Sequence, residues 1–67
     1  MKWTPEKIKA LRKSLGLTQR ELAERLGYRR RETVAEFEMG KYEPNAQARI
    51  ILDILEQQAE VQVHSDG

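Results

Sequence analysis

The chain contains no cysteine, so neither a disulfide nor a thiolate metal site can stabilise its fold. A single histidine, His64, leaves too few ligands for any other common metal site. No apolar run approaches the roughly 18 residues of a membrane span, and no signal-peptide pattern opens the chain. We therefore expect a protein of the reducing cytoplasm that uses no membrane, metal or cofactor.

The sequence also has little material for a core. A chain of 67 residues forms one domain, and a domain of this size retains only a few kcal/mol of net stability unless something reinforces it. Since disulfides and metals are excluded, association with a second copy is the reinforcement that remains. A homodimer is therefore expected.

Charge is distributed unevenly along the chain. Residues 1–31 carry ten basic and three acidic side chains, a net charge of +7, whereas residues 32–67 carry two basic and eight acidic ones, a net charge of −6. Such a chain can present a basic face to a polyanion while an acidic side stays in water. The alternative is a mixture of solvated charges with no special arrangement.

The first half of the chain predicts two short helices. Thr4 and Pro5 are typical of a helix start, and apolar residues at spacings of three and four continue to about residue 15, where Gly16 follows. Thr18 and Glu21 form a capping box, which predicts a second helix over residues 18–26 that ends at Gly27.

Two more helices are predicted in the second half. Helical spacing returns over residues 30–39 and stops at Gly40. Asn45 then caps a fourth helix, whose apolar face is wider than one small core needs. The pattern fails from about residue 58. We expect an all-α fold, with a domain over residues 1–57 and a flexible tail over residues 58–67.

The two middle helices and the tight glycine turn between them form the pattern of a helix-turn-helix. Here the chain resembles the phage-repressor and Cro-like (XRE-type) helix-turn-helix family over residues 8–55. The resemblance rests on Leu17-Thr18-Gln19, Glu21-Leu22-Ala23, Leu26-Gly27, Val34, Phe37-Glu38 and Gly40, followed by Pro44. It implies a lambda-repressor-like domain of four or five helices that binds double-stranded DNA.

One feature departs from the family. Between Gly27 and Val34 the chain has one residue more than the usual spacing, so either the turn or the first coil of the reading helix must absorb it. Counting back from Val34, the resemblance places the cap on Arg30 and the base-reading positions on Arg31, Glu32 and Glu36. Counting forward from Gly27 shifts these positions by one.

The residue types suit base recognition. An arginine can bond both major-groove acceptors of guanine, and a carboxylate can accept from the amino group of cytosine. Glu36 has the alternative role of an intrahelical partner for an arginine. The candidates for base reading are Arg30, Arg31, Glu32 and Glu36, and those for phosphate contact are Gln19, Arg20, Arg29, Lys41, Tyr42 and Asn45.

The resemblance also implies a structural ion pair between Arg12 and Glu38, which would tie the first helix to the end of the third. An enzyme is not expected, because His64 lies in the predicted tail and neither Ser14 nor Ser65 has a neighbouring base. No small-molecule substrate is expected either.

The function implied is that of a prokaryotic or phage-encoded transcriptional regulator, a repressor that binds an inverted repeat as a homodimer. The residues predicted for the dimer interface are Ile50, Ile51, Ile54 and Leu55. One alternative is an antitoxin whose toxin partner covers the acidic half. A second is a protein-interaction module that keeps the scaffold but holds a larger protein on its fourth helix.

Overall fold

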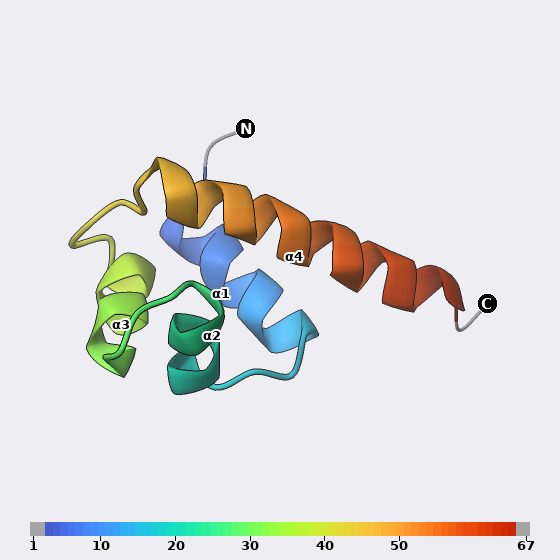
Figure 1. Ribbon diagram of the computed structural model, residues 1–67, viewed down its shortest axis with the longest axis horizontal. Coiled ribbons are helices and arrows are strands. Elements are labelled where there is room, and N and C mark those ends of the chain that lie inside the picture. Colours follow the sequence, from blue (N-terminus) through green and yellow to red (C-terminus); the bar gives the residue numbers. More distant parts are fainter. Residues whose placement is uncertain (1–2, 66–67) are drawn as a thin grey trace.

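The computed structural model describes the backbone of residues 3–65 and the side chains of residues 3–59. Within this part of the chain there are four helices and no strand: α1 (Pro5–Ser14), α2 (Gln19–Arg25), α3 (Arg31–Met39) and α4 (Ala46–Ser65). The prediction of an all-α fold with four helices is confirmed. α2 packs mainly on α3, while α4 lies across α1 and extends beyond the ends of α1 and α2 (Figure 1).

Each helix starts or stops where its local chemistry requires. The Thr4 hydroxyl accepts from the Lys7 N–H at 3.1 Å, and the Asn45 side chain accepts from the Ala48 N–H at 2.9 Å, so both residues cap as predicted. Gly27 and Gly40 have φ of 88° and 79°, a left-handed conformation that is strained for any residue with a Cβ. The turns after α2 and α3 therefore depend on these two glycines.

Every helix contributes a large side chain to the core that is almost fully buried. These are Ile8, Leu22, Val34 and Leu52, each no more than 1% exposed. Ala23 is equally buried where α2 meets α3, and its small side chain allows the two helices to approach closely. The middle helices are thus held in one orientation by side chains from all four elements.

The start of the chain is fastened to α4. Trp3 is 4% exposed, and its indole N–H donates to the Asp53 carboxylate at 2.8 Å. The Lys7 ammonium lies 4.6 Å from the centroid of the Trp3 ring and 3.6 Å from the Glu56 carboxylate. These contacts hold α4 against α1, opposite the surface formed by α2 and α3.

The predicted end of the fourth helix near residue 57 is wrong, since α4 continues to Ser65. Its sequence contains neither glycine nor proline, and the glutamine, alanine and glutamate residues beyond Leu55 favour a helix even without an apolar pattern. The backbone of the predicted flexible tail is therefore helical as far as Ser65. The side chain of His64 lies outside the described residues.

Candidate nucleic-acid interface

The amino end of α2 is fixed by the capping box that the sequence predicts. The Thr18 hydroxyl accepts from the Glu21 N–H at 3.1 Å, and the Glu21 carboxylate accepts from the Thr18 N–H at 2.8 Å. Gln19 is consequently the first residue of a well-defined helix. Its half-buried side chain lies where unpaired backbone N–H groups attract anions.

A network of largely buried polar groups joins the first three helices. Arg12 Nε donates to Glu38 Oε2 at 2.7 Å, and Arg12 Nη2 donates to Glu38 Oε1 at 3.3 Å. Arg12 Nη1 donates to the Leu17 carbonyl at 3.0 Å, and Gln19 Nε2 donates to Glu38 Oε1 at 3.2 Å. The side chains of Arg12 and Glu38 are only 14% and 6% exposed. The network therefore sets the position of the α2 amino end relative to α3.

A short connection joins α2 to α3, where the sequence has its extra residue. The Tyr28 N–H donates to the Ala23 carbonyl at 2.8 Å and closes α2, and α3 then begins at Arg31 with Arg30 as its N-cap. The cap therefore falls at the position obtained by counting back from Val34. Arg29 lies between Tyr28 and this cap, and α3 opens with a tight turn in which the Thr33 N–H donates to the Arg30 carbonyl at 3.2 Å.

The amino end of α3 is capped by an arginine instead of a residue that accepts hydrogen bonds. Arg30 makes no side-chain cap, and its Nε lies 3.7 Å from Glu32 Oε1. Arg29 and Arg31 are exposed, and neither forms an ion pair with any described residue. Positive charge therefore gathers beside unpaired backbone N–H groups, where an anion is favoured.

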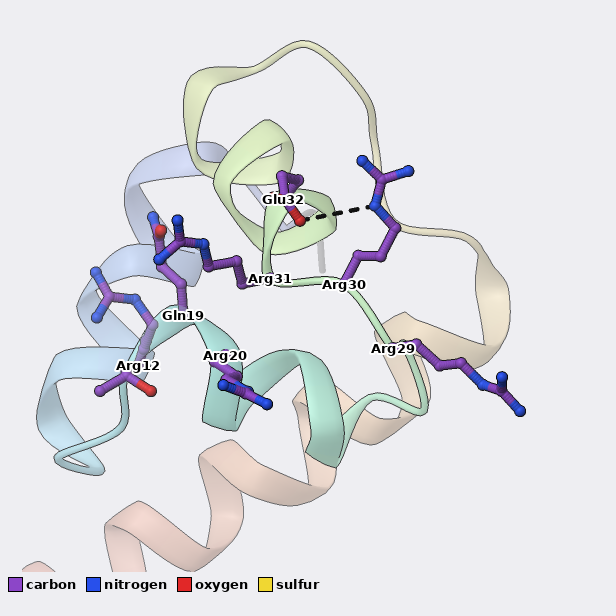
Figure 2. Close-up of a pocket in the computed structure, with 8 residues that line it drawn as sticks. Arg12, Gln19, Arg20, Arg29, Arg30, Arg31 and Glu32 are labelled. Atoms are coloured by element: carbon purple, nitrogen blue, oxygen red, sulfur yellow. Dashed lines mark ion pairs between the residues drawn. The ribbon is translucent and has the colours of Figure 1, made fainter.

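A hollow of about 750 Å³ opens between the amino ends of α2 and α3. Figure 2 shows the arginines around it, with Arg12, Gln19 and Arg31 together on one side, Arg29 on the opposite side and Arg20 between them on the first turn of α2. The lining residues are Arg12, Thr18, Gln19, Arg20, Arg29, Arg30, Arg31 and Glu32. The lining thus contains five arginines and one glutamate, so the hollow is suited to a polyanion.

That carboxylate, Glu32, is fully exposed and its pKa lies below the ordinary value for a glutamate. A hydrogen bond from the backbone N–H of Glu32 itself is the largest cause, and desolvation opposes it; the charges of Arg30 and Arg31 and a hydrogen bond from Arg30 lower the pKa further. Glu32 is therefore ionised at neutral pH, ready to accept from a donor.

The comparison with known families agrees with this geometry. Residues 8–48, which are more than half of the chain, match the helix-turn-helix family. The chain belongs to the helix-turn-helix family. It is accordingly a DNA-binding regulator, as the resemblance implied. Neither the curated proteins nor the solved structures gave a significant match.

Not all predicted site residues of this helix-turn-helix domain line the hollow. Glu36 is half-buried on the next turn of α3, and its carboxylate lies 3.8 Å from the Lys41 ammonium. Lys41 also lies 5.6 Å from the centroid of the exposed Tyr42 ring, and the Asn45 oxygen is used as a cap. These residues form a second group in and beside the loop between α3 and α4.

Sequence reasoning missed two lining residues of the helix-turn-helix surface, Arg12 and Thr18. Arg12 was predicted only as the structural partner of Glu38, yet it also borders the hollow. The sequence carried no direct signal for this position, because it depends on how Arg12 of α1 reaches Glu38 of α3, 26 residues further along the chain. Thr18 borders the hollow for a simpler reason: it caps the same end of α2.

The predicted interface residues of α4 do not share one environment. Ile50 and Ile54 are 59% and 49% exposed, whereas Ile51 is half-buried and Leu55 is 5% exposed within the core. Only Ile50 and Ile54 thus present a mainly exposed apolar surface. Within the described residues, no helix is long and apolar enough to cross a membrane, and no three potential metal ligands cluster together.

Proposed function

We propose that this protein is a transcriptional repressor of the cytoplasm that binds an inverted-repeat operator as a homodimer. The observation that carries the proposal is the hollow at the amino end of α3, where five arginines and the first turn of α2 converge. In helix-turn-helix proteins this end of the second helix enters the major groove, and the first helix crosses the backbone. Repression, as opposed to activation, is supported by the resemblance to phage repressors alone.

In this proposal Arg31 reads guanine and Glu32 reads a cytosine amino group. Arg31 has no ion-pair partner among the described residues, so its guanidinium can donate two hydrogen bonds to the guanine acceptors. Glu32 would exchange its contact with Arg30, 3.7 Å away, for the cytosine donor. Glu36 can read a base only by leaving Lys41, so it is the weaker candidate of the two carboxylates. Arg30 serves both the base edges and the adjacent phosphate.

Backbone contacts position the domain without reading sequence. On one side of α3 these are made by Gln19 and Arg20 at the start of α2. Beyond its other end they are made by the loop residues Lys41, Tyr42 and Asn45. Arg29 completes the set from the turn. With several such contacts, affinity should fall steeply as salt rises.

Arg30 and Arg31 provide the test. The double variant Arg30→Ala/Arg31→Ala should lower affinity for the preferred duplex by more than about 30-fold, because each arginine contact contributes roughly 1–3 kcal/mol. The matched control is Arg25→Ala/Arg49→Ala, which removes the same charge from exposed positions outside the hollow. Fluorescence anisotropy with a labelled duplex measures both, and circular dichroism verifies the fold.

Similar losses in the two double variants would show that only net charge matters and would remove the support for a reading site. If the protein instead binds another protein and no DNA, and substitutions outside the hollow abolish that binding, the protein-interaction module is the better description. In that case the arginine variant should retain its partner.

A further inference from the structure

The turn between α2 and α3 is anchored at its first residue. The Tyr28 N–H donates to the Ala23 carbonyl at 2.8 Å, and the half-buried Tyr28 ring packs edge-on against Phe37 with centroids 5.9 Å apart. Tyr28 also packs against the hydrophobic core. The turn therefore cannot rotate freely, and the direction taken by the next residue is fixed.

Arg29, the next residue, is exposed and forms no ion pair with the described part of the chain. Figure 2 shows its side chain pointing away from the amino end of α3, on the side opposite to Arg12, Gln19 and Arg31. Because Tyr28 closes α2 and Arg30 caps α3, Arg29 is the single residue between these two fixed positions. It thus carries positive charge to a side that the start of α2 does not occupy (Figure 2).

We propose that Arg29 holds a phosphate on the DNA strand opposite to the one contacted by Gln19 and Arg20. The inference rests on the proposed function and extends it by assigning the two flanks of α3 to different strands. A helix in the major groove, about 12 Å wide, has one phosphate backbone on each side. The amino end of α2 meets one of them. Arg29 points to the side away from Gln19 (Figure 2), where the other backbone would lie.

The consequence is a clamp that spans the groove. Arg29 is an exposed arginine on an anchored turn, so it can reach a phosphate without unfolding any element. The contact is independent of base sequence, and its loss should weaken binding to all duplexes alike. Each phosphate contact removed should reduce the slope of log affinity against log salt by about one.

The test compares Arg29→Ala with Gln19→Ala and Arg20→Ala on one preferred duplex recovered by selection. Neutral methylphosphonate replaces one phosphate at a time on each strand, and the affinity of every variant is measured for every duplex. Wild-type protein should lose roughly tenfold in affinity at its contacted phosphates, because a charge-assisted hydrogen bond is lost there. The affinity of Arg29→Ala should not change when the phosphate that Arg29 contacts is neutralised. The affinities of Gln19→Ala and Arg20→Ala should likewise not change when their own phosphates, on the other strand, are neutralised.

Arg25→Ala is the matched control. It removes one exposed arginine close to the same turn but outside the hollow, and it should leave the phosphate map unchanged. The proposal is overturned if the phosphate that loses its effect in Arg29→Ala lies on the same strand as those of Gln19→Ala and Arg20→Ala, or if no phosphate loses its effect. It is also overturned if Arg25→Ala changes the pattern of sensitive phosphates to the same extent. Wild-type protein that binds no duplex at all would overturn the proposed function itself, whereas the other outcomes would leave that function standing.

Discussion

The guanidinium of Arg12 and the carboxylate of Glu38 form the most buried ion pair of the described residues. Glu38 accepts from Arg12 and from Gln19, and Arg12 donates in addition to the Leu17 carbonyl. All the buried side-chain polar atoms described here have a partner. Removal of one member of such a set leaves a charge that water reaches poorly, which costs more than the contact itself contributes.

Arg12→Met should therefore lower the free energy of unfolding by about 3 kcal/mol, because Glu38 is left without its cation. Arg20→Met is the control: the Arg20–Glu24 pair is 4.0 Å long and both side chains are more than half exposed, so the change should be less than about 0.5 kcal/mol. Urea denaturation followed by circular dichroism measures both values. Equal losses would mean that burial of the Arg12 pair has no energetic consequence.

Glu32 links the charge of the hollow to pH. Its pKa is lowered in the folded protein, so its favourable contacts are complete above the ordinary glutamate pKa and are lost as pH falls through the lower folded value. A carboxyl titration followed by NMR should show Glu32 with a pKa below the ordinary value for a glutamate. Replacement of both Arg30 and Arg31 by alanine should shift that titration upward, although not to the ordinary value, since the backbone hydrogen bond remains. A midpoint at or above the ordinary value in the wild-type protein would contradict this account of Glu32.

The helices show how far local chemistry specifies this fold. Thr4, Thr18 and Asn45 act as the caps that the sequence predicts, and the glycines that follow α1, α2 and α3 all have positive φ. These signals are short-range, so one sequence suffices to find them. The end of α4 was missed because no cap or breaker marks it, and a helix without an amphipathic pattern gives no periodic signal.

The candidate site was predictable in composition but not in arrangement. The arginines of residues 29–31 stand out in the sequence, yet the direction in which each one points depends on the Tyr28 anchor and on the position of the α3 cap. The extra turn residue left two registers open, and only the three-dimensional placement of the cap distinguishes them. The position of Arg12 at the edge of the hollow depends on contacts between residues far apart in the sequence, and a single sequence does not reveal such contacts.

Ile50 and Ile54 give α4 a second apolar face beside the one that enters the core. We expect a second copy of the chain to cover this face. Ile50→Glu/Ile54→Glu should weaken self-association by about a hundredfold or more, since each isoleucine buried is worth roughly 1.5–3 kcal/mol. Sedimentation equilibrium provides the measurement.

Arg49→Glu is the control: it changes the net charge by the same two units at an exposed position of α4 that lies on a different face of the helix from Ile50 and Ile54. It should dimerise like the wild-type protein. A wild-type chain that remains monomeric at high concentration would mean that another protein, such as the toxin partner of an antitoxin, covers this face. A dimer that persists in the isoleucine variant would place the interface elsewhere.

The whole molecule combines a basic hollow at one surface with acidic groups on α4, among them Asp53 and Glu56, which lie near Trp3 and Lys7. Its dimensions of 37 × 23 × 19 Å are those of a small DNA-binding module. Two such domains related by a twofold axis can place their α3 ends one DNA turn apart, about 34 Å, which is why an inverted repeat is expected.

The most direct test of sequence-specific DNA binding is the selection of bound duplexes from a random pool with the purified protein, at a low and a high salt concentration. The account predicts that an inverted repeat is recovered, with guanine in each half and with binding that weakens steeply at the higher salt. Failure of the protein to bind any duplex at the lower salt would contradict it.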